Sequence, residues 1–179
     1  MNPIQVSLTE DQSRAAFRLS HIITADMVAA LTQALESLAD SPHLKLVTIE
    51  GAGPDFSFGA SVPEHAPGEI DRVLPAMHAL IYALLDFPAV TAAIVRGRCL
   101  GGGFELALAC DFVFAERDAT FGLPEIALGV FPPAASALLP ANPHSTLPSL
   151  SRRIFMASAF MMAVPSVTWP SPPMATLPP

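Results

Sequence analysis

The chain has 179 residues, a formal net charge of -7 and a single lysine, Lys45. Apolar residues make up 51% of the chain and charged residues only 14%, which excludes disorder throughout and predicts a sizeable core. An acidic chain with so few basic residues is poorly suited to nucleic acid or to an anionic membrane surface. The composition therefore favours a small molecule or another protein as the partner.

Cys99 and Cys110 lie in apolar surroundings without metal-ligand spacing, which predicts reduced thiols and gives no support for zinc. The longest apolar stretch, residues 79–95, is interrupted by Asp86 and Pro88 and is too short for a membrane-spanning helix. The first residues lack the basic start and apolar run of a secretory signal. We therefore expect no metal, no membrane span and a cytoplasmic location.

The N-terminal part of the chain alternates strand patterns with helical ones. Residues 5–8 and 16–20 flank a turn-like segment and predict a β-hairpin. Thr24 can cap a helix whose apolar residues recur every three or four positions as far as Leu38. Residues 44–50 then predict a buried strand, which is closed by a glycine-containing turn.

The same alternation continues along the chain. The predicted elements are a helix over 70–85, a buried strand over 89–95, a short apolar helix over 100–109 and a strand over 112–115. Strands that alternate with helices pair in parallel through crossover connections. The sequence therefore predicts an α/β fold.

The composition changes sharply towards the C-terminus. Residues 140–179 contain nine of the nineteen prolines, no glycine and only Arg152 and Arg153 as charged residues. Proline at this density cannot propagate a long helix. We expect residues 141–179 to be a poorly ordered tail with one helix at most, over the proline-free stretch 150–164.

Three consecutive glycines, Gly101, Gly102 and Gly103, leave a predicted strand and open the short apolar helix. Amides at the start of a helix are unpaired donors at its positive end, so they suit an oxygen that carries developing negative charge. Glu105 follows one turn later, where a carboxylate is electrostatically stabilised. The segment predicts an oxyanion site with an acid or base beside it. A tight turn without a ligand is the alternative, and the spacing matches neither a dinucleotide fingerprint nor a P-loop.

A second glycine-containing segment, residues 56–61, follows the predicted strand that ends at Glu50. It can point another backbone N–H at the same oxygen. Part of it, Gly59-Ala60-Ser61, imitates a nucleophile elbow, but the closing glycine is missing and no Asp and His follow in the usual order. Ser61 is therefore a weak candidate for a nucleophile.

Glu125 lies in a proline-containing turn among apolar residues. Burial raises the pKa of a carboxyl group and two nearby carboxyl groups push their pKa values apart, so Glu105 and Glu125 are candidates for an acid–base pair. The alternative is that Glu125 caps a short turn or pairs with Arg96 or Arg98. A structural role is predicted for Asp111. No partners are evident for His65, His78 and His144.

Together these segments resemble the enoyl-CoA hydratase/isomerase (crotonase) superfamily over roughly residues 4–139. The most specific parts are residues 99–111 and 121–129, in which the two glutamates stand twenty positions apart as in the hydratases of the family. The resemblance implies a crotonase-like (ClpP/crotonase) α/β spiral of ββα units. It also implies an acyl-CoA thioester substrate and no cofactor other than the CoA of that substrate.

The resemblance also implies the role of each site residue. Glu105 and Glu125 match the two catalytic carboxylates, which hold a water and deliver hydroxide and a proton across the α,β double bond. The N–H groups of Ala60 and Gly102 match the two donors that hold the thioester oxygen. The implied substrate-binding positions are Phe58, Gly59, Ser61, Gly101 and Gly103.

Within the superfamily, residues 53–65 are more similar to the cyclic dienoyl-CoA hydratases of anaerobic benzoyl-CoA breakdown than to fatty-acid hydratases, although those proteins commonly carry Asp where this chain has Ser61. Residues 129–133 favour the same subfamily. The resemblance therefore implies hydration of cyclohexa-1,5-diene-1-carbonyl-CoA. Two alternatives stay open: another acyl-CoA hydratase or isomerase of fatty-acid β-oxidation, and an inactive remnant or interaction protein.

Members of the superfamily usually continue into further helices that cover the acyl pocket, contact CoA and build a trimer or hexamer. Here the abrupt change of composition suggests a truncation or a frameshift. We therefore expect an acyl-CoA-binding core over residues 1–140 and an aberrant tail over 141–179, and the family's homotrimer or hexamer is in doubt for this chain.

Overall fold

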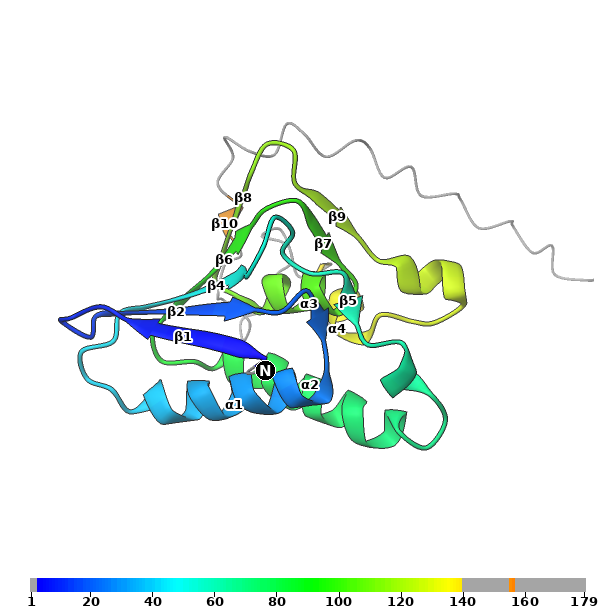
Figure 1. The fold of residues 1–179 in the computed structure, drawn as a ribbon, viewed down its shortest axis with the longest axis horizontal. Coiled ribbons are helices and arrows are strands. Elements are labelled where there is room, and N and C mark those ends of the chain that lie inside the picture. Colours follow the sequence, from blue (N-terminus) through cyan, green and yellow to red (C-terminus); the bar gives the residue numbers. More distant parts are fainter. Residues whose placement is uncertain (1–2, 140–154, 157–179) are drawn as a thin grey trace, which may run out of the picture.

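The computed structural model describes residues 3–139 and 155–156, and its central feature is a six-stranded sheet (Figure 1). The strands of this sheet are β1 (Ile4–Leu8), β2 (Arg14–Leu19), β4 (Leu46–Gly51), β6 (Val90–Val95), β8 (Phe112–Ala115) and β10 (Phe155–Met156). They are ordered β1-β2-β4-β6-β8-β10. β1 pairs antiparallel with β2, and every other neighbouring pair is parallel.

Shorter strands form a second layer beside the main sheet. β3 (Ile22–Ile23) pairs with β5 (Gly59–Ala60), and β7 (Arg98–Leu100) pairs with β9 (Thr120–Gly122), both in parallel. An isolated parallel bridge between Ser57 and Cys99 connects the two pairs.

The helices complete a repeated unit. They are α1 (Ala25–Ala39), α2 (Ile70–Leu85), α3 (Gly102–Ala109) and α4 (Pro133–Leu138), with 3-10 turns η1 (Pro63–His65) and η2 (Pro124–Leu128). The chain repeatedly passes through a main-sheet strand, a short strand and a helix: β2-β3-α1, β4-β5-α2, β6-β7-α3 and β8-β9-α4. This confirms the predicted spiral of ββα units.

The first helix shows how the sequence builds this layer. The Thr24 hydroxyl accepts a hydrogen bond from the N–H of Met27 at 3.2 Å and so caps α1, as predicted. Met27, Leu31 and Leu35 return at helical spacing and are fully buried. Figure 1 shows α1 beneath the sheet, and it packs against α2.

α3 occupies the centre of the molecule. It contacts β5, β6 and β7 as well as α2 and α4, and almost all of its residues are buried. The helix therefore holds the short strands, the main sheet and the neighbouring helices in one arrangement. Cys99 and Cys110 are buried and free, as predicted, and burial raises the pKa of both thiols, so they are unreactive.

Most long elements agree with the sequence predictions. The predicted hairpin and the predicted helix over 70–85 are both present. The predicted helix over 100–109 was wrong at its start, because Leu100 pairs with Gly122 in β7 and α3 begins at Gly102. Of the tail, only Phe155 and Met156 are described. They form β10, which pairs in parallel with the edge of β8. The predicted helix over 150–164 was therefore wrong for these two residues.

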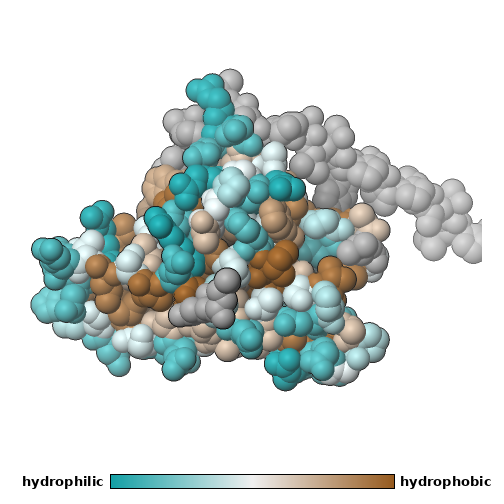
Figure 2. Space-filling view, in the orientation of Figure 1, coloured by the Kyte–Doolittle hydropathy of each residue, from teal (hydrophilic) through white to brown (hydrophobic). Residues whose placement is uncertain are grey.

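Hydrophilic and hydrophobic residues occupy different parts of the surface. Figure 2 shows hydrophilic residues at the tip of the β1-β2 hairpin and at the turn between β8 and β9, with hydrophobic residues concentrated between them. Within the described residues, none of the helices has the length and apolar character that a membrane crossing requires.

Candidate active site

The first part of the site is the N-terminus of α3. Gly101 adopts a φ of 50° and a ψ of -127°, a conformation that favours glycine, and its N–H donates to the Gly122 carbonyl at 2.9 Å. Gly102 is the first residue of the helix, so its N–H lies in the turn where no carbonyl of the helix is available. The Gly102 N–H is therefore a donor at the start of α3 that no carbonyl of this helix satisfies.

The second part is the bend at β5. The Ser61 N–H donates to the Ile23 carbonyl at 2.8 Å, and because successive N–H groups of a strand alternate in direction, the N–H of Ala60 points away from β3. A Cβ on Gly102 would lie 3.7 Å from the Cβ of Ala60. The two bends predicted to share an oxygen are therefore neighbours.

Ser57 connects these two bends, and no individual role was predicted for it from the sequence. It is 1% exposed, its hydroxyl donates to the His21 carbonyl at 3.0 Å and accepts from the Gly59 N–H at 3.1 Å. A Cβ on Gly103 would collide with the Ser57 side chain. Gly103 and Ser57 therefore fit each other, which brings the strand of Ala60 against the start of α3.

Glu105 is a buried carboxylate on the first turn of α3. Its residue is 7% exposed, and its Oε1 accepts a hydrogen bond from the Ala135 N–H at 2.9 Å. A carboxylate has further lone pairs for a second partner. The hydrogen bond therefore fixes the side chain against α4 while leaving acceptor capacity for a water molecule.

Glu125 lies in η2, half-buried, with its carboxyl group over Gly101. Its Oε2 is buried and has no hydrogen-bond partner. Burial raises the pKa of this carboxyl group and Glu105 raises it further, while its own backbone N–H and His65 lower it. The protonated form of Glu125 is therefore favoured relative to an exposed glutamate.

The alternative of an arginine partner for Glu125 was wrong. Arg96 pairs with Glu50 at 3.0 Å, and Arg98 makes two hydrogen bonds from its guanidinium to Asp55, the shorter at 3.0 Å. Both arginines thus have carboxylate partners elsewhere. Asp111 has a structural role, as predicted: it accepts from the N–H and hydroxyl of Thr91.

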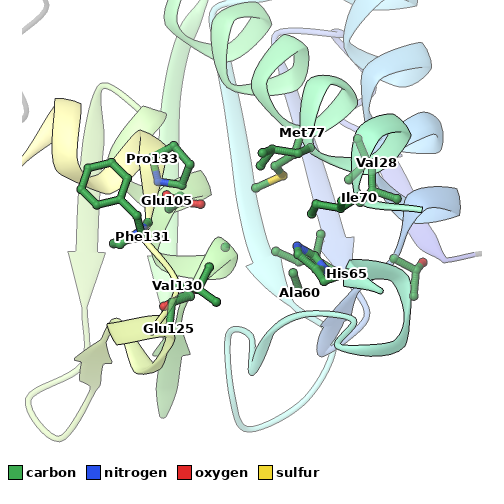
Figure 3. Close-up of a pocket in the computed structure, with 16 residues that line it drawn as sticks. Val28, Ala60, His65, Ile70, Met77, Glu105, Glu125, Val130, Phe131 and Pro133 are labelled. Atoms are coloured by element: carbon green, nitrogen blue, oxygen red, sulfur yellow. The ribbon is translucent and has the colours of Figure 1, made fainter. Parts of the chain in front are cut away.

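Both carboxylates line one cavity of about 170 Å³, together with Ala60 and Gly102. Figure 3 shows Glu105, Glu125 and the rim formed by residues 130–133 on one side, facing Ala60 on the other. Apolar side chains of α1 and α2 complete the wall: Val28, Ile70, Val73, Leu74 and Met77. The arrangement can hold a polar reacting group at one end and an apolar group at the other.

None of the five positions that the resemblance assigned to substrate binding is among the residues that line this cavity. Gly101 and Gly103 shape the start of α3, and Gly59 and Ser61 shape the strand of Ala60. Phe58 packs on the outer side, between the ring of His21 and the guanidinium of Arg98.

His65 also lines the cavity, although the sequence showed no partner for it. Its Nδ1 lies 2.8 Å from the carbonyl oxygen of Ser61. Its position four residues after Ser61 in a proline-containing turn is the signal that could have placed it near the bend. Among the described residues, no cluster of His, Cys, Asp and Glu could hold a metal ion.

A spiral of ββα units with paired carboxylates beside two backbone bends is the arrangement of crotonase-type proteins. The family model for enoyl-CoA hydratase/isomerase matches residues 20–145. The chain belongs to this family.

The relatives of the chain carry related names. Cyclohexa-1,5-dienecarbonyl-CoA hydratase of Thauera aromatica is 46% identical over 143 residues, which are 78% of this chain and 55% of that protein. Carnitinyl-CoA dehydratase of Salmonella arizonae is 33% identical over 167 residues, 92% of this chain and 61% of that protein. The chain therefore spans somewhat more than half the length of these curated relatives.

Solved structures show the same fold. An enoyl-CoA hydratase from Bacillus anthracis superposes with a TM-score of 0.73 at 26% identity, over 78% of this chain and 57% of that one. A structure of Pseudomonas aeruginosa DspI has a TM-score of 0.75 at 29% identity, over 86% of this chain and 65% of that one.

Proposed function

We propose that this protein adds water to an α,β-unsaturated acyl-CoA thioester in the syn sense, with a cyclic dienoyl-CoA of benzoyl-CoA degradation as the substrate. The observation that carries the proposal is the convergence of Glu105, Glu125, Ala60 and Gly102 on one cavity. The similarity to a cyclohexa-1,5-dienecarbonyl-CoA hydratase supports the choice of substrate.

The N–H groups of Ala60 and Gly102 are proposed to hold the thioester oxygen. Addition of water to a conjugated thioester moves negative charge onto this oxygen as an enolate forms. A preorganised donor at such an oxygen contributes about 3 to 4 kcal/mol to the transition state. Two donors on adjacent rigid bends therefore stabilise the enolate more than the substrate carbonyl.

Glu105 and Glu125 are proposed to divide the proton transfers between them. Glu105 takes a proton from water as its oxygen bonds to the electron-poor end of the conjugated system. Glu125, whose raised pKa favours the protonated form, gives its proton to the carbon next to the carbonyl, and the enolate electrons form that C–H bond. Glu105 has then gained a proton and Glu125 has lost one, so a proton transfer from Glu105 to Glu125 restores the starting state of both groups.

The cavity supports a compact acyl group. An apolar protein cavity of about 150 Å³ is sufficient for benzene, so about 170 Å³ accommodates a six-membered ring. The apolar wall from α1 and α2 faces such a ring without losing hydrogen bonds. A long straight acyl chain finds less room in this space.

The proposed reaction requires no metal and no redox cofactor, because CoA is part of the substrate and the redox state of the carbon skeleton is unchanged. A cytoplasmic location is part of the proposal, and the two free cysteines are typical of a reducing compartment. Assembly as a homotrimer or hexamer stays an expectation from the family resemblance, and sedimentation of the full chain tests it.

Glu105→Gln and Glu125→Gln test the proposal when each is assayed for loss of the double-bond absorbance of crotonyl-CoA and cyclohexadienecarbonyl-CoA. Each change is expected to lower turnover by about 10²- to 10⁴-fold. Glutamine keeps an oxygen to accept from the Ala135 N–H, so the fold is retained. Glu36→Gln on the exposed face of α1 is the matched control and leaves turnover unchanged.

Hydration that survives in either variant contradicts the proposal. Retained double-bond migration in one variant identifies an isomerase, which needs a single carboxylate. A full chain that binds neither thioester nor CoA identifies an interaction protein.

A further inference from the structure

His65 is the residue of the cavity that the proposed mechanism leaves without a task. It belongs to η1, the turn that follows the strand of Ala60. Figure 3 shows its imidazole beside Ala60 and Ile70, on the side of the cavity opposite Glu125. It therefore faces the reacting groups from the wall that is otherwise mostly apolar.

The hydrogen bond of His65 fixes the state of its ring. The carbonyl oxygen of Ser61 can only accept, so the Nδ1 at 2.8 Å must carry the proton. In the neutral ring the other nitrogen, Nε2, is then a free acceptor, and protonation turns it into a donor with positive charge. The same bond ties η1 to Ser61, whose N–H is held by Ile23.

We propose that His65 is a positioning residue of the active site: its Nδ1 holds the strand that presents the Ala60 N–H, and its imidazole faces Glu125 across the cavity and, when charged, favours the carboxylate form of Glu125. The effect of His65 on catalysis rests on the proposed function. The placement of His65 and Glu125 around one cavity does not depend on that function.

Glu125 is the ionisable group across the cavity that can interact electrostatically with His65. The titratable residues that line the cavity are His65, Glu105 and Glu125. The adjacent Glu64 is engaged elsewhere, because its Oε2 accepts from the Ala25 N–H at 2.8 Å. α1 and α2 contribute only uncharged residues to the cavity lining.

The sign of the effect follows from charge. A protonated imidazole stabilises the carboxylate form of Glu125 and so lowers the pKa of Glu125, opposing the effect of burial. The proton that Glu125 donates is therefore released more readily when His65 is charged.

Two variants separate the two tasks. In His65→Asn the amide nitrogen takes the place of Nδ1 and keeps the bond to the Ser61 carbonyl, but the ionisable ring is lost. In His65→Phe both the bond and the charge are lost. His43→Asn changes an exposed histidine outside the cavity and serves as the control.

The first measurement does not depend on turnover. Hydrogen exchange at the Ser61 amide, which donates to the Ile23 carbonyl, is expected to be faster in His65→Phe than in the unchanged chain and to stay the same in His65→Asn. Equal exchange at this amide in all three proteins overturns the inference. Because no substrate is present, this result stands whether or not the chain proves to be a hydratase.

The second measurement uses turnover of the cyclic dienoyl-CoA against pH. His65→Asn is expected to move the alkaline limb of the profile to higher pH, because the pKa of Glu125 rises when the charge of the imidazole is lost and Glu125 keeps its proton longer. His65→Phe is expected to lower kcat about tenfold in addition. Profiles of His65→Asn and the unchanged chain that superimpose overturn the inference, and so does a His65→Phe variant with full kcat.

Discussion

Glu105 and Glu125 are the same residue type on one cavity, yet their surroundings differ. Glu105 is 7% exposed, sits on the central helix and has a backbone N–H as partner. Glu125 sits on a short 3-10 turn, and its buried Oε2 has none. Because buried polar atoms are normally paired, the unpaired oxygen is the position where the proposed mechanism brings in substrate or water.

The difference shows how one cavity provides two kinds of carboxyl group. The buried helix α3 carries Glu105, which accepts a hydrogen bond from the Ala135 N–H of α4. The rim that carries Glu125 continues into Val130 and Phe131, which are 53% and 70% exposed. In the proposed mechanism, proton donation is assigned to Glu125, whose protonated form the protein favours, and water binding to Glu105, which a hydrogen bond already holds in place.

Gly101→Ala is the change expected to disturb the surroundings of Glu125 most strongly while leaving those of Glu105 in place. Its added Cβ would meet Oε1 of Glu125, and its φ of 50° strains any other residue. We expect a loss of about 1 to 3 kcal/mol in the free energy of unfolding together with nearly complete loss of hydration. Denaturant unfolding and the absorbance assay measure both.

Gly68→Ala is the control for Gly101→Ala, because Gly68 also has a positive φ, 93°, but nothing lies within 4 Å of its Cβ position. It is expected to cost about 1 kcal/mol and to leave turnover intact. Equal activity in the two variants would show that Gly101 serves only its own backbone conformation and that the space it leaves for Glu125 has no effect on turnover.

Ser57→Ala tests the wall opposite Glu125. It removes the acceptor of the buried Gly59 N–H and the donor to the His21 carbonyl, so we expect a loss of about 1 to 3 kcal/mol in unfolding free energy. Turnover should fall as well, because the Ala60 N–H is carried by the same bend.

Ser37→Ala is the matched control for Ser57→Ala. The Ser37 hydroxyl donates to the Ala34 carbonyl on the exposed face of α1, and its loss is expected to change stability by less than about 0.5 kcal/mol. A Ser57→Ala variant as stable as this control would mean that the bend does not depend on the serine.

Glu125→Gln is expected to have the smallest effect on stability, and it is expected to stabilise the protein, whereas the preceding variants destabilise it. The pKa of Glu125 in the folded chain lies above its ordinary value of 4.5, so its favourable contribution is complete below pH 4.5 and is lost as pH rises through the folded-state pKa. Glutamine carries no charge and avoids that loss. Thermal unfolding should show a higher Tm for the variant near neutral pH and no difference in acid. A lower Tm near neutral pH would contradict the raised pKa.

The sequence predicted the long elements well because their periodicity is local. The helix over 70–85 has the bounds predicted for it, and the cap at Thr24 is present. The short strands β3, β5, β7 and β9 were not predicted, since two or three residues carry no period and their pairing is between distant segments. Those strands nevertheless bring Gly59 and Ala60 to Gly102.

The candidate site shows the same division. The glycine run, Glu105 and Glu125 stand out in the sequence because glycine and an acid among apolar residues are unusual. Ser57 and His65 do not stand out, because a serine beside a phenylalanine and a histidine in a turn are ordinary. Only the tertiary structure shows that Ser57 packs against Gly103 and that His65 lines the cavity with the two glutamates.

The sequence by itself determined the α/β fold, the sharp entry into α3 and the presence of two acids suited to one site, because these follow from local pattern and residue chemistry. The tertiary structure decided which acid is satisfied and which is not. Ala135 reaches Glu105 from a segment 30 positions away, whereas the chain supplies no partner for Oε2 of Glu125 within the described residues. Burial and hydrogen bonding depend on such distant contacts, so they set the protonation of the pair only once the chain has folded.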